Sequence, residues 1–173
     1  MSVIEEPKLA PNFLCWIENE NVKDKTMMEF GSGYSSLFFS KHFKKVFSFE
    51  HDPLWINKLN ELKINNNIEF YKLDNNILNE NFVIDLIKKA DYFLIDSHYK
   101  SVSRYYLSLL IDNYKKDDSI IVLDNCEWVS DAYEFLRKKY YCIDFPYERE
   151  DGTKTETSVF FKKRNTIFSK NVI

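Results

Sequence analysis

The sequence predicts a doubly wound α/β fold, in which five parallel strands alternate with helices and a C-terminal antiparallel hairpin completes the sheet. Apolar runs of strand length alternate along the chain with runs of helical spacing. Two of the strand-length runs, YFLID and SIIVLD, are apolar almost throughout, as expected for strands that are covered on both faces. The last two strand-like runs flank Asp151-Gly152, which is a favoured hairpin turn.

Composition favours a single globular domain. The chain has 173 residues, of which 45% are apolar and 29% are charged. We expect residues 1–25 to form an N-terminal helix and candidate lid, residues 26–163 the core, and residues 164–173 a tail.

Charge and hydropathy exclude several classes of partner. The net charge of −3 argues against a dedicated nucleic-acid binder. No apolar run approaches the roughly 18 residues of a membrane span. The cysteines are three in number and widely spaced, which suits reduced thiols in the cytoplasm. We therefore expect a cytoplasmic protein with no membrane or nucleic-acid partner.

The first half of the chain contains a leading helix and three strand–helix units. Apolar spacing places each element, and Asp52 with Pro53 is a favourable helix start. Ser35 is available as a helix cap. The predicted elements, in chain order, are a helix over 12–20, a strand over 26–30, a helix over 35–43, a strand over 45–50, a helix over 53–62, a strand over 68–73 and a helix over 81–89.

The second half contains two more strand–helix units and then the hairpin. Ser130 is a candidate cap for the last helix. The predicted elements are a strand over 92–96, a helix over 103–114, a strand over 119–124, a helix over 130–140, and hairpin strands over 142–147 and 156–162. Right-handed crossovers would place the helices on both faces of the sheet.

The first strand ends at a candidate ligand-binding loop. The chain has only three glycines, yet Gly31 and Gly33 flank Ser32 directly after this strand. Glycine allows a tight turn and a close approach to a ligand, and the following helix N-terminus suits an anionic group. Glu29, just before the loop, could accept hydrogen bonds within it or face a ligand ammonium.

The ends of the next two strands also carry polar residues. Glu50 ends the second strand, nineteen residues after Gly31, where a carboxylate can accept both hydroxyls of a ribose. His51 would border the same nucleoside. Asp74 or Asn75, after the third strand, could meet an adenine amino group, although Asp-Asn-Asn is also a favourable turn sequence.

These motifs together resemble the class I S-adenosylmethionine-dependent methyltransferases. The segments are Glu-Phe-Gly-Ser-Gly-Tyr-Ser, Phe-Glu-His-Asp and Leu-Asp, and the resemblance in order and spacing covers residues 27–162, including the hairpin. It implies a Rossmann-like sheet of order 3-2-1-4-5-7-6 and S-adenosyl-L-methionine as cofactor. One departure is Ser35, where many members have a third glycine.

The resemblance also implies roles for single residues. Glu29, Gly31 and Gly33 would line the methionine part of the cofactor, Glu50 its ribose and Asp74 its adenine. We expect Ser32, His51, Asn75 and Asp96 to contribute to the same site.

A pair of acidic residues follows the fourth and fifth strands. If these strands are neighbours, Asp96 and Asp124 lie about 5 Å apart and cannot both stay ionised cheaply without a cation. That cation could be the cofactor's sulfonium, a metal or a cationic substrate. With Asn125, the pair makes an oxygen-rich set that suits Mg²⁺ or Ca²⁺.

The same set resembles a subfamily, the cation-dependent catechol-type O-methyltransferases. Asp96, Asp124 and Asn125 match the positions of its metal ligands. The catalytic lysine of that group would fall at Tyr99, and Lys100 comes one residue later. Because the lysine is shifted by one residue, the resemblance assigns neither the catalytic base nor metal dependence to this chain.

Three residues are candidates for the base. His98 follows the fourth strand and could take a proton from an acceptor hydroxyl or amine as the methyl group moves. Lys100 and Asp96 are the alternatives. A histidine exposed on the surface without a chemical role fits the sequence equally well.

The chain length limits which segments could cover a bound substrate. Only 25 residues precede the first strand and no long insertion covers the core, so the cover could come from the N-terminal helix, from residues 97–103 or from residues 146–155. A large substrate, a shallow pocket or a second subunit in a homo-oligomer would each explain this. We expect methyl transfer to a hydroxyl or amine of a small molecule or sugar-like metabolite.

Three other functions remain open. One is another S-adenosylmethionine-using enzyme, decarboxylase-like or ring-forming. The second is a nicotinamide-dependent oxidoreductase, against which Glu29 and the hairpin argue. The third is a non-catalytic cofactor-binding module.

Overall fold

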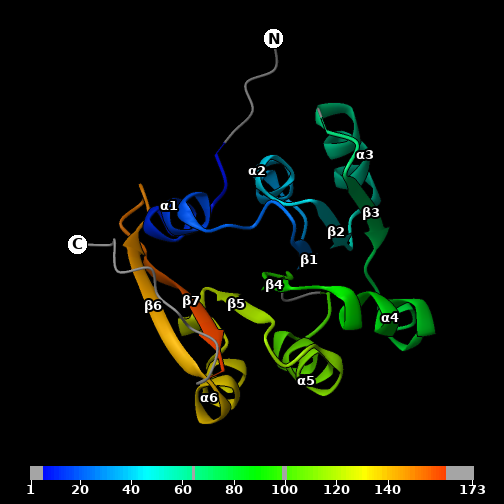
Figure 1. Cartoon of the computed structure of the whole chain (residues 1–173). Helices are drawn as coiled ribbons and strands as arrows, with labels where there is room; N and C mark the ends of the chain where they lie inside the picture. Colours follow the sequence, from blue (N-terminus) through cyan, green and yellow to red (C-terminus); the bar gives the residue numbers. More distant parts are fainter. Residues whose placement is uncertain (1–5, 64, 99–100, 163–173) are drawn as a thin grey trace.

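One seven-stranded sheet organises the protein (Figure 1). The computed structural model describes residues 6–63, 65–98 and 101–162. The sheet order is β3-β2-β1-β4-β5-β7-β6, and all neighbours are parallel except the two pairs that involve β7. The strands are β1 (Thr26–Phe30), β2 (Lys45–Glu50), β3 (Ile68–Lys72), β4 (Tyr92–Ile95), β5 (Ile120–Asp124), β6 (Tyr141–Glu148) and β7 (Lys154–Phe161). The predicted architecture and strand order are confirmed.

Six α-helices of the described chain cover the sheet, three on each face (Figure 1). They are α1 (Pro11–Asn19), α2 (Tyr34–His42), α3 (Pro53–Leu62), α4 (Asn81–Lys89), α5 (Arg104–Tyr114) and α6 (Ser130–Lys139). Helices α1–α3 share one face and α4–α6 the other, as right-handed crossovers require.

Two hydrophobic cores, one on each face, hold the helices to the sheet. Successive strand residues point to opposite faces, so Met27 packs with the α1–α3 layer and its neighbour Met28 with the α4–α6 layer. Both methionines are fully buried. The central strands are therefore apolar on both faces, and polar side chains gather where these strands end.

The element boundaries differ from the predicted ones mainly at the caps. The Asp52 carboxylate accepts a hydrogen bond from the Leu54 amide at 2.9 Å, as predicted. The cap prediction for Ser130 was wrong, because α6 begins at that residue and makes no side-chain cap bond. Ser35 also lies inside its helix; the hydroxyl at the start of α2 belongs to Ser36, which accepts from the Gly33 amide at 3.2 Å.

Three further features complete the chain. Two short 3₁₀ helices, η1 (Ile77–Asn79) and η2 (Cys126–Trp128), were not predicted. The hairpin ladder extends to the pair Glu148–Lys154, so both of its strands are longer than expected. Within the described residues no helix has the length and apolar character needed to cross a membrane. The predicted tail, 164–173, lies outside the described residues.

Candidate active site

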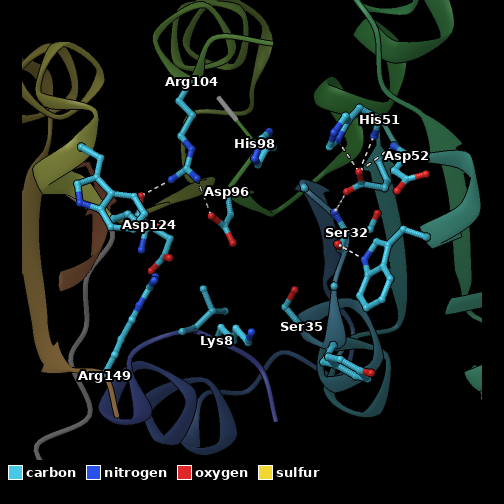
Figure 2. A pocket seen from close by; sticks show the side chains of 18 residues that line it. Lys8, Ser32, Ser35, His51, Asp52, Asp96, His98, Arg104, Asp124 and Arg149 are labelled. Carbon is cyan, nitrogen blue, oxygen red and sulfur yellow. Dashed lines mark hydrogen bonds and ion pairs between the residues drawn. The ribbon is translucent and has the colours of Figure 1, made fainter. Parts of the chain in front are cut away.

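A cavity of about 500 Å³ opens at the carboxyl ends of β1, β2, β4 and β5 (Figure 2). Parallel strands place the loops that follow them at one edge of the sheet, which is where open α/β sheets bind ligands. One side of the cavity is formed by the glycine loop and the residues after β2. The other side is formed by the residues after β4 and β5, with contributions from the N-terminal segment and the hairpin.

The glycine loop is fitted closely against the end of β4. Gly31 has φ +103°, a backbone conformation that residues with side chains rarely adopt. A Cβ added to Gly31 would lie 2.3 Å from the carbonyl oxygen of Asp96. The Gly31 amide donates to the carbonyl of Phe49 at 2.8 Å, and the Asp96 amide donates to the carbonyl of Phe30 at 2.8 Å. These two hydrogen bonds hold the loop between the ends of β2 and β4.

Glu29 lies beneath this loop and does not line the cavity. Its carboxylate is fully buried and accepts hydrogen bonds from the hydroxyls of Ser35, Ser36 and Ser48, the last at 2.6 Å. Burial raises the pKa of Glu29 to about 7, although the three hydroxyls act in the opposite direction. Of the two roles considered for this residue, the structure shows the hydrogen-bonding one, with bonds to the start of α2 and to β2.

We expect Glu29→Gln to flatten the pH dependence of stability. Between pH 4.5 and about 7 the folded protein keeps a proton on Glu29 that the unfolded chain has released. The free energy of unfolding therefore falls as pH rises through this window, by about 3 kcal/mol for this group. The variant should lack this part of the fall in urea denaturation across the window. Glu61→Gln, at an exposed position in α3, is the control. An unchanged slope in the Glu29 variant would contradict the assignment.

Glu50 fixes the turn after β2. One carboxylate oxygen accepts from the Ser32 amide at 3.1 Å, and the other accepts from the amides of His51 and Asp52 at 2.8 and 2.9 Å. The His51 imidazole Nδ1 also lies 2.5 Å from that second oxygen. Glu50 is only 5% exposed yet lines the cavity, so it joins the glycine loop to the turn after β2 (Figure 2).

Aromatic rings line the rest of this side. The Trp55 indole nitrogen donates to the carbonyl of Ser32 at 2.9 Å, and its ring packs edge-on against Tyr34 with centroids 5.8 Å apart. The rings of His51 and His98 stack at 5.4 Å with planes 9° apart. His98 therefore lies at the junction of the two sides of the cavity.

Arg104 joins the ends of β4 and β5. Its guanidinium pairs with the carboxylate of Asp96 at 2.8 Å, and it donates to the backbone carbonyls of Ser97 at 2.8 Å and Asp124 at 2.5 Å (Figure 2). The arginine side chain is 11% exposed. The chain itself thus places a positive charge beside Asp96.

The Asp124 side chain is hydrogen-bonded by a residue of β7, the strand next to β5. Its carboxylate accepts from the Thr157 hydroxyl at 2.5 Å, and the same hydroxyl oxygen accepts from the Ala10 amide at 3.1 Å. Burial, with the nearby charge of Asp96, raises the pKa of Asp124 to about 8. Burial also raises the pKa of Asp96, although Arg104 opposes the shift. Neither carboxyl has the character of a fully hydrated anion.

The three predicted metal ligands make other contacts in the structure. Asp96, Asp124 and Asn125 do line the same cavity. However, Asp96 is paired with Arg104, Asp124 accepts from Thr157, and the Asn125 amide donates to Thr155 at 3.1 Å. These contacts engage one oxygen of each carboxylate and the amide nitrogen of Asn125, so Mg²⁺ binding at this site stays a prediction. Among the described residues there is no cluster of three or more His, Cys, Asp or Glu side chains suited to a metal.

The other predicted residues separate into three groups. The cavity is lined by Gly31, Ser32, Gly33, Glu50, His51, Asp96 and His98. Asp74 and Asn75 are not in this lining, and Asp74 instead accepts from the amides of Asn76 and Ile77, each at 3.0 Å, which is the turn role considered for it. Lys100 lies outside the described residues.

Sequence reasoning missed three cationic side chains that line the cavity, Lys8, Arg104 and Arg149. The sequence position of one of them, Arg104, could have indicated a functional role. Arg104 is the first residue of α5, where the helix dipole disfavours a positive charge. Such a local conflict is characteristic of functional sites.

Comparison with known proteins agrees with the fold. No family profile and no curated protein matches the sequence. An O-methyltransferase from Bacillus cereus in complex with SAH is similar in structure, with a TM-score of 0.67 and 12% identity over 92% of this chain and 84% of that one. Precorrin-6y C5,15-methyltransferase from Geobacter metallireducens has a TM-score of 0.63 and 16% identity over 91% and 93%. Precorrin 8w decarboxylase from Methanobacterium thermoautotrophicum has a TM-score of 0.61 and 15% identity over 91% and 92%.

At identities this low, the likeness concerns the fold and not the activity. The similarity covers more than nine tenths of this chain and of two of the neighbours. The chain has the Rossmann-like fold of the class I S-adenosylmethionine-dependent methyltransferases.

Proposed function

We propose that the protein is an S-adenosylmethionine-dependent methyltransferase that acts on a hydroxyl or amine of a small molecule. The observation that carries the proposal is the arrangement of the glycine loop, Glu50 and Trp55 around one cavity at the carboxyl ends of the strands. The cavity volume of about 500 Å³ is in the range of small-molecule sites.

The residues present fit this cofactor. The loop Gly31–Gly33 would contact its methionine part, and Glu50 would accept the ribose hydroxyls through its oxygen lone pairs. His51, Asp52 and Trp55 would border the adenosine, since they line the cavity beside Glu50 and Asp74 does not. Asp96 would lie toward the sulfonium, because it follows β4 and its side chain is 28% exposed.

The chain's own residues would then orient the acceptor and accept one proton. When bound, the cofactor supplies a methyl group on a positively charged sulfur, so methyl transfer depends chiefly on alignment of the two reactants. His98 lines the cavity and is exposed to it, so its imidazole is our candidate to take the proton from the acceptor. Asp96 is the alternative base, although Arg104 holds one of its oxygens.

A cover for the cavity would come from two segments. Lys8 and Leu9 of the N-terminal segment and Arg149 of the hairpin all line the cavity. Both segments are among the candidate lids expected from the sequence. A small-molecule acceptor would fit between them and the glycine loop, with or without a second subunit.

Calorimetric titration with S-adenosylmethionine and S-adenosylhomocysteine tests the cofactor site. We expect both to bind the protein, and Glu50→Gln to weaken both by about tenfold or more, because a neutral amide replaces the carboxylate acceptor. Glu61→Gln should leave the affinity unchanged. If the unaltered protein binds neither compound, the proposal is wrong.

Product analysis distinguishes methyl transfer from the two alternatives, another S-adenosylmethionine-using reaction and a non-catalytic binding module. Release of S-adenosylhomocysteine with an acceptor identifies methyl transfer, whereas consumption of S-adenosylmethionine without that product identifies another reaction. Cofactor binding with no turnover across an acceptor screen identifies a binding module.

A further inference from the structure

The end of the cavity farther from the glycine loop carries positive charge. Arg149 lines it and reaches toward Asp124, and Figure 2 shows Lys8 between Arg149 and Ser35. Trp128 also lines the cavity. Arg104 is also there, but its charge is matched by the Asp96 carboxylate. The remaining cations come from two segments that are far apart in the chain, the N-terminal segment and the hairpin, so the fold itself brings them together.

Arg149 packs on an aromatic ring, and the carboxylates of Asp124 and Asp151 act on it electrostatically from farther away. Its guanidinium lies 5.1 Å from the centre of the Trp128 ring, which is a cation–π arrangement. Within the described residues no carboxylate oxygen comes within 4.0 Å of a charged nitrogen of Arg149. Figure 2 shows the side chain extending from the end of the hairpin toward Asp124, with Lys8 beside it.

One donor of this side chain is buried and unsatisfied. Arg149 Nε has no hydrogen-bond partner and less than 1 Å² of exposed area. A buried N–H without an acceptor is unfavourable, and such groups are rare in folded proteins. Two other side-chain atoms in the described chain share this state, on Asn67 and Ser101, and neither residue lines the cavity.

We propose that this end of the cavity binds an oxyanion, a carboxylate or a phosphate, that the methyl acceptor carries. The inference rests on the proposed function and gives the class of its substrate. The terminal N–H groups of the Arg149 guanidinium would donate hydrogen bonds to the oxygens of the anion, and Lys8 would add a second positive charge. Trp128, which is 59% exposed, would hold the guanidinium in position and offer a ring face to the acceptor.

The cofactor's own carboxylate is the competing occupant. Arg149 lies after β6 and reaches the cavity on the side of β5 and η2, whereas the loop that would hold the cofactor follows β1. The acceptor is therefore the partner that this placement favours. The two occupants differ in a measurable way, because only one of them makes cofactor affinity depend on Arg149.

The test uses three small probes on the full chain. Benzoate carries the carboxylate, phenyl phosphate the phosphate, and benzyl alcohol is the neutral control. Each is titrated against the protein alone and against the protein saturated with S-adenosylhomocysteine, with tryptophan fluorescence and calorimetry as readouts. Arg149→Gln is compared with Arg137→Gln, which alters an exposed arginine on α6 that does not line the cavity.

We expect at least one anionic probe to bind more tightly than benzyl alcohol and to lose about tenfold or more of its affinity in Arg149→Gln. The preferred probe tells carboxylate from phosphate. Arg137→Gln should bind like the unaltered protein. Equal binding of benzyl alcohol, or unchanged anion binding in Arg149→Gln, would overturn the proposal. A loss of S-adenosylhomocysteine affinity in that variant would also overturn it, by assigning the arginine to the cofactor. Failure of the unaltered protein to bind S-adenosylhomocysteine would instead reject the proposed function, and anion binding to the protein alone would still decide this inference.

Discussion

Gly31→Ala is expected to destabilise the protein by about 4 kcal/mol or more and to remove binding of S-adenosylhomocysteine. Two effects add. The residue has φ +103°, and the new Cβ would lie 2.3 and 2.6 Å from the carbonyl oxygen and carbon of Asp96. These are backbone atoms that no rotamer change can move aside. The loop could then leave the end of β4 only by breaking the bond from the Gly31 amide to Phe49.

The chain offers a matched control for this substitution. Gly152 also has a positive φ, of +80°, but an added Cβ would meet nothing within 4 Å. Gly152→Ala should therefore show only the conformational cost, about 1–2 kcal/mol, and keep the ligand affinity. Urea denaturation and calorimetric titration of both variants measure the difference. Equal losses in the two variants would show that the fit against Asp96 is unimportant.

Arg104→Met is expected to destabilise the protein by about 2–4 kcal/mol, because it leaves the Asp96 carboxylate without its partner in a poorly hydrated place. The substitution also removes the donors to the backbone carbonyls of Ser97 and Asp124, so the ends of β4 and β5 lose their link. The loss should shrink at low pH, where protonation of Asp96 removes the unpaired charge. Urea denaturation over a pH series measures it.

An exposed pair provides the comparison. Arg137 bonds Asp144 at 3.1 Å on the surface, with side chains 47% and 31% exposed. Arg137→Met should change stability much less than Arg104→Met, because water screens the pair and solvates what remains. Similar losses in both variants, or a loss in Arg104→Met that does not depend on pH, would contradict the role assigned to Arg104.

The comparison of these sites shows what the sequence could predict. The period of the apolar residues placed every strand and α-helix, and the ends of the strands then located Gly31, Glu50, Asp96 and Asp124 at one edge. The sequence also predicted that Asp96 and Asp124 come close to each other, and the charge of Asp96 does act on Asp124. These are consequences of spacing and of strand direction, which are local or nearly local properties.

The identity of each partner was harder to predict. Glu29 bonds Ser48 because those residues are opposite each other in the β1–β2 register, and a register is set by the whole sheet. Arg104 reaches Asp96 only because α5 starts beside the end of β4, at an angle that the sequence does not reveal. Arg149 is separated in the chain from the preceding cavity residue, Trp128, by the whole of α6 and β6. Contacts of this kind depend on side-chain conformations and long-range packing.

The hydroxyl of Thr157 has a consequence for how the molecule is assembled during synthesis. It binds the Ala10 amide and the Asp124 carboxylate together, although Ala10 precedes it by 147 positions. Strand β7, which carries it, inserts between β5 and β6 and is the last strand of the described residues in chain order. The acidic pair and the N-terminal cover can therefore reach their final positions only when nearly all of the described chain has emerged. Such non-local pairing makes the closing step slow relative to the local helices, and the cavity is among the last parts of the fold to form.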